Sequence, residues 1–330
     1  MHFRDFGSTK LRVSEIGFGG WALGGQWGAQ DDQQSLLALR TALENGVNFL
    51  DTAAGYGDGR SERVIAQLLR ELDDSERPLV ATKTPPADGP WPPSPGCRWE
   101  DRYSAVYLRE NVEQRLKNLG VERLDVLQLH TWTRAWNDDP QPLLILRRLK
   151  EEGKIGVIGV STPEQDQNCV VQLMRDGLVD CVQVIFNLFH QEPLAQLLPV
   201  AEETGTAVIV RVALDEGGLV GKYDNDHVFS DDDFRQAYFA GDRLQRTNAR
   251  VAEIRHDLER LGLSETYSLA DLAIRFALSP PMVSTVITGI RNQQQAIANT
   301  RASSLPPLTP ATLEVLARHN WLRGVWYAGK

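Results

Sequence analysis

The chain has 330 residues, a length that a barrel of alternating strands and helices commonly occupies as one domain. Hydrophobic residues make up 42% and charged residues 24%, as in ordinary soluble globular proteins and unlike disordered or fibrous chains. The formal net charge of -9 argues against a broad surface for nucleic acid or anionic membranes, because a net acidic surface repels phosphate groups.

In the first half of the chain, short apolar runs alternate with amphipathic helices. Residues 3–13 are predicted to form a hairpin that precedes the repeating pattern. Strands are predicted over residues 16–19, 47–51, 79–83 and 124–130. Helices are predicted from about residue 31, where an acidic cap precedes the first apolar position, over residues 61–72, and beyond a proline-rich loop at Leu108, Val112, Leu116 and Leu119.

The second half repeats the same alternation. Strands are predicted over residues 155–161, 181–186, 207–211 and 283–287, and helices over 293–301 and from about 309 to 321. Residues 214–241 form the longest irregular stretch, which is rich in Gly and Asp and too long for a simple connection. We therefore expect this stretch to be a functional loop.

Eight strand–helix units in one direction predict a (β/α)8 barrel that forms a single domain over residues 1–330. The N-terminal hairpin would cap the end of the barrel opposite the active face. An open doubly wound sheet is the alternative, but no Gly-x-Gly-x-x-Gly pattern follows the first strand. The barrel is therefore the favoured fold class.

The sequence gives no sign of disulfides, metal ligands or export. Its three cysteines, Cys97, Cys169 and Cys181, are an odd number at wide spacing with no Cys-x-x-Cys pair, so no zinc site is predicted. The first residues lack the apolar core of a signal peptide, and no run of about 18 apolar residues occurs. We expect a cytoplasmic protein that binds no metal and no membrane.

Ionisable residues stand at three neighbouring strand ends, where a (β/α)8 barrel places its active site. Asp51 ends the second predicted strand, Lys83 the third and His130 the fourth, and Tyr56 follows Asp51 in the next loop. Each alone has a structural explanation, as a turn cap, a solvated lysine or a core histidine. Their convergence favours a catalytic site.

The chemistry of these four residues is complementary. A tyrosine hydroxyl, whose pKa in water is about 10, is a poor proton donor at neutral pH, and the charge of Lys83 is expected to lower that pKa. Asp51 would keep a buried Lys83 charged. His130 would hydrogen-bond a substrate oxygen beside Tyr56. The four residues are therefore the predicted catalytic group.

The residues around these positions closely resemble the signature of the aldo-keto reductase family. Residues 48–57 read Asn-Phe-Leu-Asp-Thr-Ala-Ala-Gly-Tyr-Gly and are followed by Ser61-Glu62; Ala81-Thr82-Lys83 and Leu127-Gln128-Leu129-His130 are similar to the two other active-site segments. The resemblance implies hydride transfer between NADPH, bound in extended form, and an aldehyde or ketone, or the reverse reaction. Tyr56 would be the general acid or base, tuned by Lys83 and Asp51.

The resemblance also implies a set of cofactor-binding residues. Ser161 and Gln183 would hold the carboxamide, whereas Thr162 stands in place of the usual Asn and Arg211 in place of a stacking aromatic. Some bacterial branches share an Arg before an Asp-Glu-Gly loop; a strand-end ion pair is the alternative role for Arg211. The implied set is Gly20, Trp21, Ser161, Thr162, Gln183, Arg211, Leu214, Gly217, Leu219, Gly221, Lys222, Gly289, Arg291, Gln295 and Asn299.

The last strand–helix connection is expected to bind the adenosine end. Arg291, Gln295 and Asn299 share a helix face, and Arg291 favours NADP(H), with NAD(H) as the alternative. Ala298 stands where the family usually has Glu. One adenine contact is therefore expected to be missing.

Tryptophans follow several predicted strands on the active face. Trp21, Trp27 and Trp132 are predicted to line the substrate site, with Trp91 and Trp136 as further aromatic walls; loop packing is their alternative role. Tyr327 could also reach the mouth of the pocket. The expected partner is a small carbonyl or alcohol, including sugars, with direction and oligomeric state open. An NADP(H)-binding regulatory subunit with little turnover is the alternative function.

Overall fold

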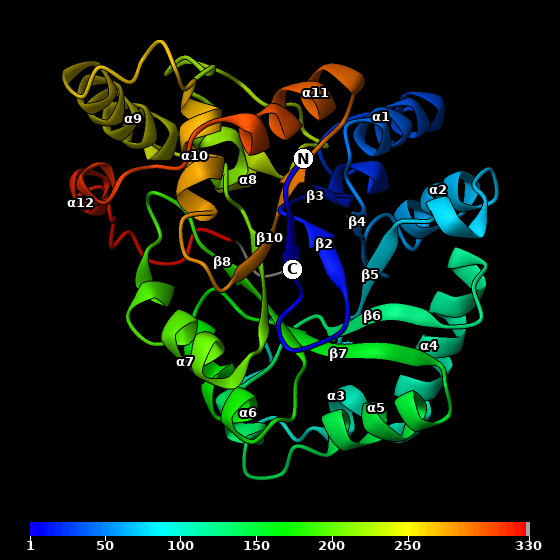
Figure 1. Ribbon diagram of the computed structural model, residues 1–330. Helices are drawn as coiled ribbons and strands as arrows, with labels where there is room; N and C mark the ends of the chain where they lie inside the picture. Colours follow the sequence, from blue (N-terminus) through cyan, green and yellow to red (C-terminus); the bar gives the residue numbers. More distant parts are fainter. Residues whose placement is uncertain (328–330) are drawn as a thin grey trace.

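A closed barrel of eight parallel strands forms the centre of the computed structural model, which describes residues 1–327 (Figure 1). The strand order is β10-β3-β4-β5-β6-β7-β8-β9, which confirms the (β/α)8 prediction. The last three residues of the predicted domain lie outside the described part. The barrel strands are β3 (Ile16–Gly19), β4 (Phe49–Asp51), β5 (Leu79–Thr84), β6 (Leu124–Leu129), β7 (Ile155–Ser161), β8 (Cys181–Ile185), β9 (Ala207–Arg211) and β10 (Val283–Gly289).

Helices surround the barrel on its outside (Figure 1). They are α1 (Asp32–Glu44), α2 (Arg60–Leu69), α3 (Glu100–Tyr103), α4 (Ala105–Leu119), α5 (Gln141–Glu151), α6 (Val171–Arg175), α7 (Leu197–Thr204), α8 (Arg235–Tyr238), α9 (Arg243–Arg260), α10 (Leu269–Ala277), α11 (Gln293–Arg301) and α12 (Pro310–Ala317). The predicted helices over 61–72 and 309–321 are both shorter than expected at their C-terminal ends. None of the helices within residues 1–327 is long and apolar enough to cross a lipid bilayer.

Side-chain caps fix where several helices begin and end. Asp31 accepts a hydrogen bond from the Gln34 backbone N–H and starts α1, as the acidic cap predicted. Ser268 and Asp271 form a capping box at the start of α10. Gly120 adopts the left-handed conformation that ends α4, with φ of 68°. These caps set the directions in which chain segments leave and enter the strands.

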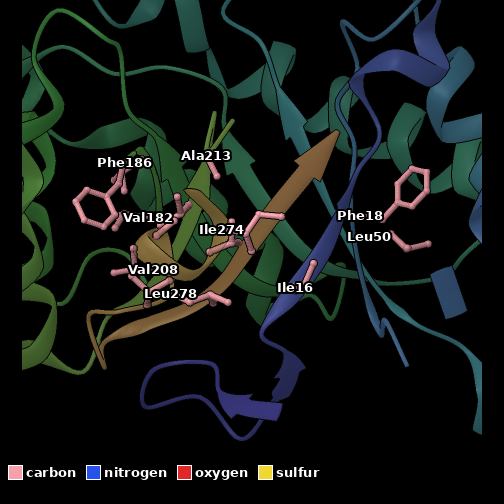
Figure 2. Packing of buried hydrophobic residues seen from close by; sticks show 14 of the residues in the cluster. Ile16, Phe18, Leu50, Val182, Phe186, Val208, Ala213, Ile274 and Leu278 are labelled. Atoms are coloured by element: carbon pink, nitrogen blue, oxygen red, sulfur yellow. The ribbon is translucent and has the colours of Figure 1, made fainter. Parts of the chain in front are cut away.

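The apolar core has two layers. The larger layer lies between the strands and the helices, where Ile16 and Leu50 point outward from their strands and Ile274 of α10 faces the barrel (Figure 2). The smaller layer fills the barrel interior and includes Phe49, Val126, Val157 and Ile209. Long-range packing of both layers holds the strand ends, and hence the side chains on them, in fixed positions.

The predicted N-terminal hairpin is present and consists of β1 (Phe3–Asp5) and β2 (Arg12–Ser14). Phe6 from its turn enters the interior layer and packs on Phe49, with ring centroids 5.6 Å apart. Both rings are fully buried. The hairpin therefore plugs the N-terminal end of the barrel, which leaves the opposite end for a site.

The predicted irregular stretch over 214–241 is largely loop but contains two short ordered parts. A 3-10 helix covers Asp215–Val220, and α8 covers Arg235–Tyr238. The stretch returns to the loop after β3, because the backbone N–H of Phe234 donates to the Gln26 carbonyl (3.2 Å) and Trp27 bridges to Asp233. It thus spans the C-terminal face of the barrel.

Candidate active site

Three predicted catalytic side chains meet at the carboxyl ends of β4 and β5. The ammonium of Lys83 donates to Asp51 Oδ2 at 2.6 Å, to the Thr52 carbonyl at 2.9 Å and to the Tyr56 hydroxyl at 3.2 Å. Asp51 and Lys83 are adjacent because their strands pair in parallel, and Lys83 is fully buried. The structure therefore brings together the carboxylate of Asp51, the ammonium of Lys83 and the phenol of Tyr56, which lie on separate segments of the sequence.

The protonation states follow from burial and from these contacts. Burial lowers the pKa of Lys83, but the charge of Asp51 and the hydrogen bonds to Asp51 and Tyr56 raise it by more, so the net pKa lies above its ordinary value. Lys83 therefore stays an ammonium at neutral pH. The expected counter-ion role of Asp51 agrees with this geometry.

Lys83 lowers the pKa of Tyr56, as expected, but the net pKa is raised. Burial raises the pKa of Tyr56, and the opposing effect of Lys83 does not fully offset it. The sequence showed the cation but not the degree of burial. Tyr56 is therefore a neutral phenol at physiological pH.

Gln183 supports this cluster from β8, on the opposite side of the barrel from β4. Its side-chain amide donates to Asp51 Oδ1 at 2.8 Å, and the Gln183 side chain is almost fully buried. Asp51 thus receives hydrogen bonds on both carboxylate oxygens. This contact was not expected from the sequence, which assigned Gln183 only to the cofactor.

Aromatic rings surround the Tyr56 hydroxyl. The His130 ring packs edge-on against Tyr56, with centroids 5.8 Å apart, and edge-on against Trp91 at 5.2 Å. Trp21 stacks beside Tyr56 at 6.1 Å and meets Trp27 edge-on at 5.7 Å. A substrate oxygen that reaches Tyr56 would therefore lie within largely aromatic walls.

A cavity opens from this cluster toward the loops after β7, β9 and β10. Its lining includes three predicted catalytic residues, Asp51, Tyr56 and His130, and two of the predicted substrate tryptophans, Trp21 and Trp27. The predicted cofactor residues that line it are Trp21, Ser161, Thr162, Gln183, Arg211, Leu214, Gly217, Lys222, Gly289, Arg291 and Gln295. Residues far apart in the sequence thus share one continuous cavity.

Four other predicted cofactor residues are not part of this lining: Gly20, Leu219, Gly221 and Asn299. Leu219 is fully buried in the outer core layer, and Gly221 ends the 3-10 helix in the left-handed conformation. Gly20 donates its N–H to the Asp51 carbonyl at 2.8 Å, and Asn299 donates to the Gly289 carbonyl at 3.2 Å. These residues position the lining rather than form it.

Trp132, a predicted substrate residue, is not part of the lining of this cavity and lines a second, separate pocket. Its ring is fully buried, packs edge-on against Trp136 at 5.3 Å, and donates its indole N–H to Asn137 at 2.7 Å. The short turn over Arg134–Trp136 folds the ring away from the main cavity. Loop packing, the alternative role of the tryptophans, holds for Trp132 and Trp136, whereas Trp91 lines the cavity.

The Arg291 side chain is held by neutral groups at the far end of the cavity. Its guanidinium donates to Gln30 Oε1 at 3.1 Å and to the Ala29 carbonyl at 2.9 Å. Its backbone N–H donates to the Gln295 side chain at 2.8 Å. Among residues 1–327 it forms no ion pair, so its positive charge is available to an anion.

Arg235, Glu164 and Glu216 also line the cavity but were not predicted. The Arg235 guanidinium lies 4.6 Å from the Trp27 ring centroid and forms an ion pair with Asp233. Arg235 belongs to the irregular stretch over 214–241, whose sequence has no periodicity that would show which side chains face inward. The sequence indicated Arg235 only indirectly, through the prediction that the stretch over 214–241 is a functional loop.

The C-terminal segment borders the same cavity. Tyr327 lines it, as the sequence allowed, and its hydroxyl hydrogen-bonds the Glu216 carboxylate. Arg323 forms an ion pair with fully buried Asp215 and hydrogen-bonds the Tyr238 hydroxyl at 2.8 Å. These contacts tie the segment to the loop after β9.

Comparisons with known proteins identify the class to which this barrel and cavity belong. The model of the aldo/keto reductase family matches residues 15–320. Aldo-keto reductase YhdN of Bacillus subtilis is 29% identical over 303 residues, covering 89% of this chain and 86% of the relative. The NADH-specific methylglyoxal reductase of Escherichia coli is 26% identical over 327 residues, covering 91% of this chain and 92% of the relative.

A solved structure agrees with the sequence comparisons. The glycerol dehydrogenase AKR11B4 from Gluconobacter oxydans superposes with a TM-score of 0.76 at 26% identity, covering 99% of each chain. The fold and the cavity thus define a barrel oxidoreductase. The chain belongs to the aldo/keto reductase family, which confirms the resemblance seen in its motifs.

Proposed function

We propose that this protein interconverts a small aldehyde or ketone and the corresponding alcohol with a nicotinamide cofactor, and that Tyr56 transfers the proton. The observation that carries the proposal is the contact of buried Lys83 with both Asp51 and the Tyr56 hydroxyl at the floor of a cavity. A buried cation beside a phenol stabilises the phenolate that proton transfer produces.

Each of the four residues has a distinct part in the proposed mechanism. In the reductive direction, the Tyr56 hydroxyl donates its proton to the substrate oxygen, and the Lys83 ammonium stabilises the resulting tyrosinate. Asp51 keeps Lys83 charged, and Gln183 holds the Asp51 carboxylate in place. His130 donates a hydrogen bond to the substrate oxygen and orients it toward Tyr56.

The cavity lining fits a nicotinamide dinucleotide. Arg211 Nε is buried without an acceptor among residues 1–327, which leaves a donor for a ligand at the Tyr56 end. Arg291 and Lys222 supply positive charge for phosphates farther along the cavity. Ser161 and Gln183 would hold the carboxamide, and the bound cofactor would supply or accept the hydride.

We propose NADP(H) as the preferred cofactor and NAD(H) as the alternative. The guanidinium of Arg291, which has only neutral acceptors among residues 1–327, supports a contact with a 2'-phosphate, which only NADP(H) carries. The name of the Escherichia coli relative, an NADH-specific methylglyoxal reductase, supports the alternative. Dissociation constants for NADPH and NADH will decide between them.

The proposed substrate is a small carbonyl compound or polyhydroxy alcohol. Trp21, Trp27 and Trp91 give the cavity aromatic faces, which pack against the C–H groups of such molecules. Two relatives are named for methylglyoxal and glycerol, both small oxygenated three-carbon compounds. Sugars belong to the same chemical class.

The test is cofactor turnover with a panel of substrates. NADPH oxidation would be followed with methylglyoxal, glyceraldehyde and 4-nitrobenzaldehyde, and NADP+ reduction with glycerol and sugars. Turnover that disappears in Tyr56→Phe supports the proposal. Tight NADPH binding without turnover on any member of the panel would overturn it and favour the regulatory-subunit function.

A further inference from the structure

Arg211 ends β9 at the C-terminal face of the barrel, which is also the face where Asp51 and Tyr56 lie. It is in register with Ile185 of β8, and it lines the cavity together with Tyr56. Its guanidinium donates to the Thr162 carbonyl at 2.9 Å, and the Thr162 hydroxyl donates to the Gln183 carbonyl at 3.1 Å. Arg211 is therefore connected through two residues to the Asp51 cluster.

No ion pair neutralises the charge of Arg211 among residues 1–327. Its interaction with the Thr162 carbonyl is a hydrogen bond to a neutral group, and its Nε atom is buried without an acceptor. The lysine of the proton-transfer cluster differs, because Asp51 pairs with it. The strand-end ion pair considered for Arg211 is therefore not formed in the described part of the chain, although the Glu164 carboxylate interacts with this cation at longer range.

The field of this cation reaches the reacting groups. Arg211 lowers the pKa values of Asp51 and Tyr56, although in both cases burial has the larger effect and raises them. A charge that acts on Tyr56 also acts on a ring that exchanges hydride next to Tyr56.

Oxidised and reduced nicotinamide differ in charge at the ring. The oxidised ring is a cation and the reduced ring is neutral, whereas the phosphates carry the same charge in both forms. We propose that Arg211 makes this cavity bind the reduced nicotinamide more tightly than the oxidised one. The inference rests on the proposed function, which places the ring beside Ser161 and Gln183.

The consequence concerns the direction of hydride transfer. When an alcohol is oxidised, the hydride with its two electrons passes from carbon to the cationic ring, and the hydroxyl proton passes to tyrosinate 56. The hydride transfer removes the positive charge that faces Arg211, which this cation favours, whereas the proton transfer removes the tyrosinate charge that Arg211 stabilises. The affinities of the two cofactor forms isolate the first effect. A tenfold difference in affinity between the two forms shifts the potential of the bound two-electron couple by about 30 mV.

Glu164 offers an opposing charge for the test. It lines the cavity in the loop after β7, and its carboxylate accepts a backbone hydrogen bond from Tyr327 at 3.4 Å. Burial raises the pKa of Glu164, and Arg211 opposes that rise. Measurements at pH 8 favour the ionised form of this carboxylate.

The experiment measures dissociation constants of the full-length protein for NADPH and NADP+ by quenching of tryptophan fluorescence. In Arg211→Met, the ratio of the NADP+ constant to the NADPH constant should fall about tenfold, as expected for a unit charge at several ångströms in a partly solvated site. Arg211→Lys, which keeps the charge, should retain the wild-type ratio within about threefold. Glu164→Gln should raise the ratio.

Other outcomes identify which part fails. If Arg211→Met weakens both forms equally and also weakens 2'-phospho-ADP-ribose, Arg211 binds a phosphate, and the inference is wrong. If both forms bind the wild type and no variant changes the ratio, the charge does not reach the ring, which also overturns it. If the wild-type protein binds neither dinucleotide, the proposed function itself is wrong. Circular dichroism of each variant checks that it is folded.

Discussion

At the Tyr56 end of the cavity, the positive charge of Lys83 is paired inside the barrel, whereas at the opposite end the charge of Arg291 is held by neutral groups. Lys83 and its partner Asp51 stand on the strands β5 and β4, whereas Arg291 stands in the loop after β10. A paired, buried charge is preorganised for one reaction, whereas an unpaired charge on a loop attracts an anion from solvent. We therefore call the end at Tyr56 the chemical end, because its charge is placed for a reaction. We call the end at Arg291 the capture end, because its charge is placed to bind an anion.

The sharpest test of the chemical end is Tyr56→Phe. Loss of the hydroxyl removes the proton donor but leaves Lys83 paired with Asp51, so carbonyl reduction should fall about 10²- to 10⁴-fold. The dissociation constant for NADPH should stay close to wild type. Steady-state kinetics and fluorescence titration measure both quantities, and wild-type turnover in this variant would refute the assigned role.

Lys83→Met tests whether the chemical end is also a structural element. The change leaves the Asp51 carboxylate buried without its cation, which should lower the free energy of unfolding by about 3–5 kcal/mol. Urea denaturation measures the loss. The double variant Lys83→Met with Asp51→Asn is the matched control and should recover part of the stability; no recovery would mean that Met is poorly accommodated there.

Arg291→Ala tests the capture end. Loss of a charge-assisted contact should weaken NADPH about tenfold or more, and NADH less, because NADH lacks the 2'-phosphate. Fluorescence titration with both cofactors gives the ratio, and Arg291→Lys controls for charge. Equal weakening of NADPH and NADH would show that Arg291 supports the loop and does not recognise the phosphate.

The pH dependence of kcat/KM is the test with the smallest expected effect, because kcat/KM for reduction should not change near neutral pH. Since the pKa of Tyr56 is raised, the free protein keeps the phenol protonated through neutral pH. The kcat/KM for reduction should be flat there and decline only as pH rises through that pKa, whereas the kcat/KM for alcohol oxidation should increase with pH. A reduction profile that declines below pH 8 would contradict the raised pKa.

The sequence predicted the chemical end better than the capture end. In a parallel barrel all strands end on one face, so strand-end residues such as Asp51 and Lys83 can be placed together from periodicity alone. No such rule applies to loops. Trp132 was therefore expected in the main cavity, whose lining does not include it, and Arg235, within an irregular stretch, was not identified.

Two further differences arise from tertiary packing. The pKa of Tyr56 depends on how deeply its hydroxyl is buried, which a motif does not reveal. The predicted helix over 309–321 ends at Ala317, after which the chain turns back so that Trp321 and Trp326 pack edge-on at 5.1 Å. Helical propensity gave no information about this return, because long-range contacts determine it.

The hairpin that plugs the barrel has a practical consequence for handling the protein. Met1 leads into β1 and packs near Gly46, on the closed end of the barrel, whereas Tyr327 lies at the rim of the cavity. An affinity tag or surface linker joined at Met1 would leave the cavity open to solvent. Immobilised protein should therefore be coupled through the N-terminus.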